Sequence, residues 1–363
     1  MNINKNMYMN INKKFDFNSY WLTGFTQADG SFVVNFEKKT LGKIPYYPRP
    51  AFVLTQSINE KDMMRHLHKY LNVGNIRMSR NDISIVVRSL DELTNTIIPH
   101  FCKYPLYGEK GQAFKVLVKV VSLIKAKAHL EVQGFMEILD ISFFMNKTSL
   151  RTKDSYNHIV SRLNEKKALY REKFIAVSQV KRNSGTALPL VKSTCALDGI
   201  DGIDAIPKIE AFTLNAKYLT GLIDGDGSFN FGFKTSRLRV EPNFTITMEL
   251  KDKPLLEKVQ TYFNCGGVYT LKSNAARYQV NKAKDIAEKI IPLLENFNTK
   301  KKEHLPNITK ALAILSVKGR ISEKHLIEIV SLVYNLNHKG KARKMTRESY
   351  LNKHIKNINL RQA

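Results

Sequence analysis

Residues 20–32 read YWLTGFTQADGSF, and residues 217–229 read KYLTGLIDGDGSF. Both stretches contain Leu-Thr-Gly and close on Asp-Gly-Ser-Phe, and their aspartates, Asp29 and Asp226, lie 197 positions apart. A single Asp-Gly pair is weak evidence, because it marks turns in many folds. Two copies that each open a longer similar segment indicate an internal repeat.

The similarity continues downstream of each copy with small changes of register. The tripeptide Ile-Ile-Pro occurs at 97–99 and again at 290–292, and Gly74 matches Gly266. The sequence therefore predicts four regions. They are a first repeat at 15–147, a basic helical segment and linker at 148–212, a second repeat at 213–338, and a basic tail at 339–363. The tail is either a solvated end or an extra contact to phosphate.

Each repeat opens with a pattern typical of a helix that runs directly into a strand. Asn18 or Ser19 is the expected N-cap of the first helix, and Asn215 that of the second. Gly30 and Gly227 stand where each helix is expected to end. Apolar and polar residues then alternate, which predicts a strand with a core side and a solvated side.

Helical and strand patterns then alternate along the rest of each repeat. Apolar residues at helical spacing predict helices over 60–72 and 252–264. Strands are expected around 75–88 and 267–281, and two further helices follow in each repeat. The predicted class is α+β, with antiparallel sheets and one polar face on each sheet.

The charge of the chain is strongly positive, with 58 Lys+Arg against 32 Asp+Glu and a net charge of +26. This excess favours a partner rich in phosphate over a merely soluble basic protein. We interpret the basic, polar face of each sheet as a surface that fits a nucleic-acid groove, and the alternative is an ordinary solvated sheet face. The candidate DNA contacts are Ser31, Asn35, Lys39, Arg77, Arg88, Ser228, Asn230, Lys234, Arg277, Gln279 and Asn281.

Several classes of protein are excluded by composition. No run of 18 apolar residues is present, so a membrane-spanning helix is not expected. The three cysteines, Cys102, Cys195 and Cys265, are too far apart for a disulfide framework or a zinc knuckle. The first residues resemble neither a secretory signal nor a typical transit peptide.

Small residues four positions apart mark the first helix of each repeat. The pairs are Gly24 with Ala28, and Gly221 with Gly225. A glycine within a helix costs about 0.5–1 kcal/mol relative to alanine, so it needs a compensating role. Close approach of two helix backbones is such a role. We therefore expect the two helices to cross at the repeat interface, around a pseudo-twofold axis.

This crossing makes the negative charges of Asp29 and Asp226 energetically unfavourable. Each aspartate ends a helix, where the dipole disfavours a carboxylate by about 0.3–1 kcal/mol. Mutual repulsion adds to that cost if the helices run side by side. A divalent cation between the two acids removes both costs, and carboxylate oxygens suit Mg²⁺. The pair therefore predicts metal-activated phosphodiester hydrolysis rather than two ordinary turns.

At this point the motifs LTGFTQADG and LTGLIDGDG resemble those of a LAGLIDADG homing endonuclease in its single-chain, two-repeat form. The resemblance implies two pseudo-twofold-related αββαββα repeats whose sheets form a DNA-binding saddle. It also implies Mg²⁺-dependent cleavage of both strands across the minor groove, leaving 3′ overhangs. The metal-binding acids fall on Asp29 and Asp226, with the backbone carbonyls of Ala28 and Gly225 as further ligands.

The resemblance also implies a catalytic glutamine and lysine in each repeat. In the first repeat they fall on Gln56 and Lys103. The second repeat departs from the pattern, since the aligned residues are Met248 and Asn296, although Lys300, Lys301 or Lys302 could replace the lysine. Two residues before each metal-binding acid, the motif has Asp224 in the second repeat but Gln27 in the first. The resemblance implies that this position is not a metal ligand.

The function expected from these features is that of a monomeric, intron-encoded DNA endonuclease that makes double-strand breaks and promotes intron mobility. Its expected cofactor is Mg²⁺ or Mn²⁺, with Ca²⁺ bound without turnover. The alternatives are an RNA maturase of the same fold, with host intron RNA as partner, and a catalytically silent DNA-binding protein. Mitochondrial encoding is favoured over encoding in a chloroplast.

Overall fold

The computed structural model describes residues 15, 17–143, 145–146, 151–181, 214–234, 239–295, 300–317, 321–334, 336 and 345–352. Contacts divide the chain into two compact units, which we describe separately. One unit holds Met1–Asp29 together with Ala211–Ala363, and the other holds Gly30–Glu210. The helix of the first motif therefore makes its main contacts with the second repeat.

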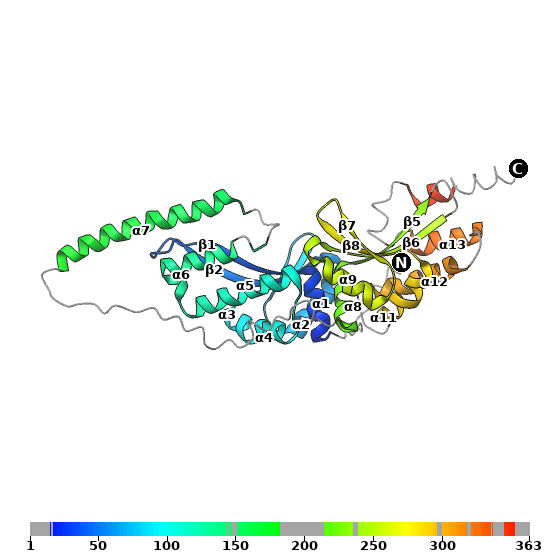
Figure 1. Cartoon of the computed structure of the whole chain (residues 1–363), viewed down its shortest axis with the longest axis horizontal. Coiled ribbons are helices and arrows are strands. Elements are labelled where there is room, and N and C mark those ends of the chain that lie inside the picture. Colours follow the sequence, from blue (N-terminus) through cyan, green and yellow to red (C-terminus); the bar gives the residue numbers. More distant parts are fainter. Residues whose placement is uncertain are drawn as a thin grey trace, which may run out of the picture. The chain divides into compact units, whose positions relative to one another are not determined.

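The unit Gly30–Glu210 is built on a four-stranded antiparallel sheet, the first sheet, with the order β1-β2-β4-β3. Its elements are β1 (Gly30–Lys38), β2 (Tyr46–Ser57), α2 (Lys61–Leu71), β3 (Asn75–Met78), β4 (Asp82–Val87), α3 (Leu90–Glu92), α4 (Ile98–Lys103), α5 (Gly108–Lys125), α6 (Val132–Ser142) and α7 (Lys153–Lys181) (Figure 1).

The other unit repeats this plan on a second sheet, with the order β5-β6-β8-β7. Its elements are α1 (Ser19–Asp29), α8 (Ala216–Asp226), β5 (Gly227–Lys234), β6 (Arg239–Glu249), α9 (Lys253–Phe263), β7 (Gly267–Leu271), β8 (Ala275–Val280), α10 (Ala283–Asp285), α11 (Ile291–Glu295), a short 3-10 helix (Lys300–His304), α12 (Leu305–Ser316) and α13 (Glu323–Val333). The predicted α+β class and the repeated helix–strand order are confirmed.

The caps predicted for the motif helices are present. Asn18 Oδ1 accepts a hydrogen bond from the Trp21 N–H at 3.0 Å, and Asn215 Oδ1 accepts one from the Tyr218 N–H at 2.8 Å. The helices end at Asp29 and Asp226, as predicted. Gly227 has an extended backbone (φ −71°), and its role is steric, because a Cβ there would lie 2.7 Å from the Ile223 carbonyl oxygen.

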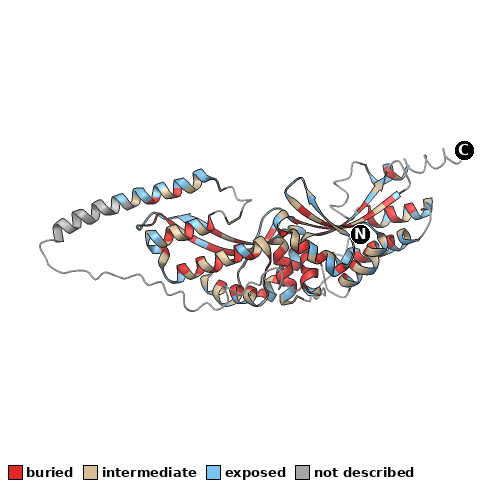
Figure 2. Cartoon of the chain, viewed as in Figure 1, coloured by how far each residue is buried: buried red, intermediate tan, exposed pale blue. Residues whose placement is uncertain are grey.

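Aromatic residues form the core between the first sheet and its helices. Phe32 of β1 and Phe52 of β2 pack against Phe101 of α4, with ring centroids 5.5 Å apart in both pairs. Phe114 of α5 contacts the same cluster at 5.4–5.6 Å. In Figure 2 the buried residues lie where helices and strands face each other within each unit. The apolar side predicted for the first strand is therefore the core side.

The basic helical segment predicted between the repeats contains α7, and the start of this helix packs into a second core cluster of the unit Gly30–Glu210. Ile159 and Leu163 of α7 are buried in a cluster with Tyr46, Phe135 and Phe143. The guanidinium of Arg151 donates a hydrogen bond to the Phe143 carbonyl at 2.9 Å, and it also donates to the Val34 carbonyl. Residues 182–213, which include the predicted linker, lie outside the described part of the chain.

A matching aromatic contact occurs near the end of the chain. Tyr350 is only 2% exposed, and its ring packs 5.2 Å from Phe233 and 5.8 Å from Tyr334. It lies in a helical turn over residues 347–352. Part of the segment predicted as a basic tail therefore belongs to the core of its unit.

Candidate active site and nucleic-acid interface

The two motif helices, α1 and α8, cross with their backbones in direct contact. A Cβ added to Gly24 would lie 1.9 Å from the Tyr218 carbonyl oxygen, and one added to Gly221 would lie 2.1 Å from that of Trp21. These distances are far below van der Waals contact, so only glycine fits at either position. The crossing predicted from the small-residue stripes is present.

The same crossing brings the acid of one helix to the end of the other. A Cβ added to Gly225 would lie 2.2 Å from the Ala28 Cβ and 2.8 Å from Asp29 Oδ2. The carboxylate of Asp29 therefore lies beside the residue that directly precedes Asp226. Asp29 and Asp226 are partly exposed at these helix ends. The crossing thus brings Asp29, Ala28 and Gly225 together.

The earlier motif position has a different environment. Asp224 is fully buried, and its Oδ2 accepts a hydrogen bond from Trp21 Nε1 at 2.8 Å. Gln27, at the matching position of α1, is 2% exposed. A buried carboxylate requires hydrogen-bond donors, and the indole of the partner helix is one. The hydrogen bond from Trp21 to Asp224 therefore joins the two helices, whereas Asp29 and Asp226 remain partly exposed.

A lysine lies at the end of α8. Lys301 Nζ donates hydrogen bonds to the carbonyl oxygens of Ile223 at 2.6 Å and Asp224 at 2.7 Å. The last carbonyls of a helix lack intrahelical partners and carry partial negative charge, so a cation stabilises them. Lys301, one of the three lysines considered as replacements in the second repeat, therefore reaches the motif helix. Asn296 lies outside the described residues.

The first repeat has a comparable lysine that the sequence analysis missed. Lys110, in the first turn of α5, donates a hydrogen bond to the carbonyl of Gly30, the residue that follows Asp29. Lys103 is exposed at the end of α4, and its ammonium lies 5.6 Å from the Tyr104 ring centroid. The available signal was a lysine near the start of a helix in both repeats, in the first turn of α5 and just ahead of α12, but the reach of each lysine depends on packing.

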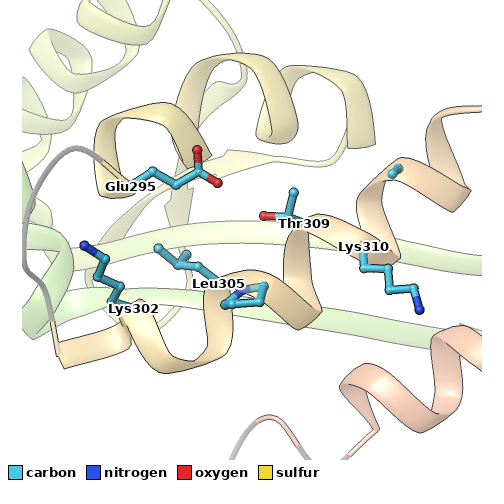
Figure 3. Close-up of a pocket in the computed structure, with 7 residues that line it drawn as sticks. Glu295, Lys302, Leu305, Thr309 and Lys310 are labelled. Atoms are coloured by element: carbon cyan, nitrogen blue, oxygen red, sulfur yellow. The ribbon is translucent and has the colours of Figure 1, made fainter.

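Lys302 lies on a different surface. With Glu295, Leu305, Pro306, Thr309, Lys310 and Ala313 it lines a pocket of about 450 Å³ (Figure 3). This pocket is formed by α11, α12 and the short 3-10 helix between them. It contains neither motif aspartate, so we do not count it as part of the candidate active site.

Gln56 and Met248 occupy equivalent positions near the ends of β2 and β6. Phe52 pairs with Val87 and Phe244 pairs with Val280, so each residue lies four positions beyond matching phenylalanines. Both face the core side of their sheets. Gln56 is half-buried and Met248 is 8% exposed. The departure of the second repeat from the family pattern is therefore a true difference at one structural position.

The residues at the helix ends fit a hard divalent cation. Among the described residues, no group of three or more His, Cys, Asp or Glu side chains could hold a metal ion. The candidate set is instead two carboxylates with backbone carbonyls. Mg²⁺ is commonly bound by one or two carboxylates, completed by water and phosphate oxygens. Oxygen donors of this kind, grouped at two helix ends, match that preference.

Each sheet has a polar face that is opposite its core. In the first sheet, Asn35 pairs with Arg49, and Arg77 pairs with Ser84, which in turn pairs with Thr55. Directly paired residues of antiparallel strands point to the same side. The first polar face accordingly carries Ser31, Asn35, Glu37, Tyr47, Arg49, Thr55 and Arg77.

The second polar face follows the same rule. Ser228 pairs with Thr245, which pairs with Gln279, and Arg277 pairs with Thr247. Arg277 Nε donates a hydrogen bond to Thr247 Oγ1 at 3.1 Å. This face carries Ser228, Asn230, Lys234, Arg239, Glu241, Thr247, Arg277 and Gln279. The remaining predicted contacts, Lys39, Arg88 and Asn281, are exposed directly after the ends of β1, β4 and β8.

Comparisons with known proteins agree with this architecture. A model of the LAGLIDADG endonuclease family matches residues 22–121 and 219–312. The chain is 43% identical over 292 residues to a probable intron-encoded DNA endonuclease 1 of Mycosarcoma maydis, covering 80% of this chain and 97% of that protein. The chain belongs to the LAGLIDADG endonuclease family.

Solved structures show the same fold. The LAGLIDADG homing endonuclease I-GzeII, solved in complex with its DNA target, matches with a TM-score of 0.66 and 25% identity over 89% of this chain and 99% of that one. I-SmaMI, bound to uncleaved DNA in the presence of calcium ions, has a TM-score of 0.66 and 23% identity over 87% of this chain and 97% of that one. The second likeness concerns the fold alone. In the part of our chain that the structure describes, no helix is long and apolar enough to cross a membrane.

Proposed function

We propose that this chain is a site-specific DNA endonuclease that cuts both strands of a long duplex target and so promotes mobility of its intron. The observation that carries the proposal is the α1–α8 crossing, which brings Asp29 Oδ2 against Gly225, beside Asp226. Two partly exposed acids are therefore brought to adjoining helix ends. They suit hydrolysis of a phosphodiester that the polar faces hold in place.

Asp29 and Asp226 would hold Mg²⁺ or Mn²⁺, with carbonyl oxygens of Ala28 and Gly225 as further donors. A bound divalent ion supplies an activated water and neutralises charge on phosphate oxygens. Ca²⁺ would bind without turnover, in keeping with I-SmaMI bound to uncleaved DNA in the presence of calcium. These roles rest on the oxygen donors grouped at the two helix ends.

Lysines would act beside the acids. Lys301 neutralises the carbonyl end of α8 and so fixes the turn that precedes Asp226. Lys110 binds the carbonyl of Gly30 next to Asp29. Gln56 and Lys103 remain proposed catalytic residues of the first repeat. An ammonium near a scissile phosphate stabilises the charge that develops in the transition state.

The proposed partner is double-stranded DNA, bound by a monomer. The net charge of +26 and the two polar faces support this, as does the DNA target in the I-GzeII structure. Phosphate contacts would supply most of the affinity and base contacts the specificity. Mitochondrial encoding is proposed because a relative from Podospora anserina, 29% identical over 114 residues, is encoded in an ND4 intron.

The test begins with randomised duplex DNA from which the chain selects bound sequences in Ca²⁺. These duplexes are then transferred to Mg²⁺, and both strands are followed by labelling. We expect cleavage at one position on each strand, with 3′ overhangs. The same preparation is assayed for splicing of its host intron RNA.

Each other outcome contradicts the proposal in a different way. Selected DNA that is never cut in Mg²⁺ or Mn²⁺ would identify a silent DNA-binding protein. Splicing activity without DNA cleavage would identify an RNA maturase. Failure to select any DNA sequence would remove the proposed partner.

A further inference from the structure

An arginine on the first polar face is held in place by two neighbours. Arg49 Nε donates a hydrogen bond to Glu37 Oε2 at 2.9 Å, and its guanidinium carbon lies 4.5 Å from the centroid of the Tyr47 ring. The side chains of Arg49 and Glu37 are 51% and 48% exposed. The guanidinium is therefore oriented within the polar face while remaining open to a ligand.

This orientation leaves the two terminal amino groups of the Arg49 guanidinium available to a ligand. Glu37 takes the Nε–H, and in the described part of the chain no hydrogen bond engages the two terminal amino groups. Those groups form a fork that fits the O6 and N7 acceptors of guanine. A partner carboxylate and an aromatic plane reduce the freedom that an arginine would otherwise lose on binding.

The second sheet carries the same cluster with the charges exchanged. Because Phe52 matches Phe244 and Phe32 matches Phe229, Arg49 is equivalent to Glu241. By the same alignment Glu37 is equivalent to Lys234, and Tyr47 to Arg239. Glu241 lies 3.2 Å from Lys234 Nζ and 3.2 Å from Arg239 Nε. The acidic Glu241 thus occupies the position in the second sheet that the basic Arg49 occupies in the first.

We propose that Arg49 is a specificity-determining residue that reads a guanine in one half of the target, and that Glu241 excludes guanine at the equivalent position of the other half. This inference rests on the proposed function and adds its base preference. A carboxylate accepts from the amino group of cytosine but repels the acceptor edge of guanine. The target is therefore asymmetric at this pair of positions.

The strand geometry gives the approximate place of this guanine. Arg49 pairs with Asn35, five residues along β1 from Gly30, where the motif helix gives way to the strand. Five residues of a strand span about 17 Å. That length corresponds to roughly five base-pair steps of about 3.4 Å. The guanine lies in the outer part of its half-site, away from the motif acids.

An ion pair that serves stability alone is the competing explanation. Exposed ion pairs contribute little to folding, so removing Arg49 should leave the free energy of unfolding almost unchanged. The Arg65–Asp62 pair on α2, with atoms 3.7 Å apart, is a matched control, because α2 packs by its apolar residues against the sheet. Arg65→Gln makes the same change of charge outside the polar face.

The experiment compares base preferences selected from randomised duplex DNA by the full chain and by its Arg49→Gln and Arg65→Gln variants. The wild type should prefer guanine at one outer position. Arg49→Gln should lower that preference about 5- to 150-fold, at that position alone, and Arg65→Gln should change nothing. Unaltered preferences with Arg49→Gln, or weakening spread evenly over all positions, would overturn the inference while leaving the proposed function intact.

A second experiment gives the first sheet the cluster residues of the second sheet and again measures base preference. The triple variant Glu37→Lys, Tyr47→Arg and Arg49→Glu gives the first sheet the residues of the second. Its outer guanine preference should be replaced by the preference found at the equivalent position of the other half-site. Retention of guanine would overturn the inference. Failure of every protein, wild type included, to select DNA would overturn the proposed function and this inference with it.

Discussion

At the scale of single residues, the helix crossing depends on two glycines that no other residue can replace. Gly24→Ala would place a methyl group 1.9 Å from the Tyr218 carbonyl oxygen, which belongs to a helix backbone and cannot rotate away. Over-packing commonly costs about 1–3 kcal/mol. We expect a loss at or above the upper end of that range, measured by urea unfolding.

Gly232→Ala is the matched control for this change. Its Cβ would lie 3.7 Å from the Glu241 carbonyl oxygen, an ordinary contact. Its free energy of unfolding should stay within about 0.5 kcal/mol of the wild type. Equal effects of the two substitutions would show that α1 and α8 do not meet as described.

A second residue makes stability depend on pH. Burial lowers the pKa of His100 from 6.5 to about 4. The unfolded chain therefore binds this proton more readily between those values, and stability falls as the pH drops from about 6.5 towards 4. From pH 7 to pH 4.5, this residue should remove about 2–3 kcal/mol from the free energy of unfolding.

The variant His100→Gln isolates that contribution, because glutamine stays neutral over the whole range. Urea unfolding at both pH values should show a smaller loss in the variant than in the wild type. Burial also lowers the pKa of His129, but this contribution is common to both proteins and cancels in the comparison. Identical pH dependence in the two proteins would contradict a buried neutral His100.

At the scale of elements, the end of the chain is a core element as well as a source of charge. Tyr350 is 2% exposed against Phe233 and Tyr334. Tyr350→Ala should lower the free energy of unfolding by about 3 kcal/mol, because it removes a buried ring. Tyr262→Ala, at a tyrosine that is 42% exposed, should cost less than about 1 kcal/mol. Comparable losses would mean that the segment does not dock.

Much at this scale could be predicted from the sequence, because local chemistry decides it. The N-caps Asn18 and Asn215 follow from capping rules. Gly30 and Gly227 marked the ends of the motif helices, although Gly227 has an extended backbone and its role is steric. The strands follow from alternation, which exposes one side to water. Gly24 and Gly221 identified the helix crossing, since a glycine within a helix is a recognisable cost.

The missed features depend on which distant segments pack together. Lys110 and Lys301 lie far along the chain from the helix ends that they reach, and a lysine near the start of a helix does not by itself indicate which carbonyl it contacts. The Arg49 cluster forms only when β1 and β2 pair in the observed register, and the sequence of either strand alone does not indicate that register. Tyr350 looked like part of a basic tail, because its apolar partners lie in other elements. Only the assembled core reveals these contacts.

At the scale of the whole molecule, the two repeats are unequal at one proposed catalytic position. Gln56 can donate and accept hydrogen bonds, whereas the thioether of Met248 is at most a weak acceptor and cannot order a water in the same way. Both repeats have a lysine near a motif end, so the inequality rests on this pair. We expect one strand to be cut faster than the other, with a nicked duplex accumulating first.

A strand-labelled time course on a selected target measures this inequality. The variant Gln56→Met makes the repeats alike at this position, so the nicked intermediate should diminish as the faster strand slows. Simultaneous cutting of both strands by the wild type would mean that the difference has no kinetic effect.

The decisive measurement compares cleavage and binding of one selected duplex by the wild type, Asp29→Asn and Asp226→Asn. Each variant keeps the size of the side chain and removes one carboxylate charge at the α1–α8 crossing. In Mg²⁺, either variant should lose at least about a thousandfold in cleavage rate, in line with loss of charge stabilisation. DNA affinity in Ca²⁺ should stay within a few-fold, as it should for the surface control Asp62→Asn, which should also cut normally. Full cutting by either motif variant would contradict the assignment of the two aspartates to the chemistry.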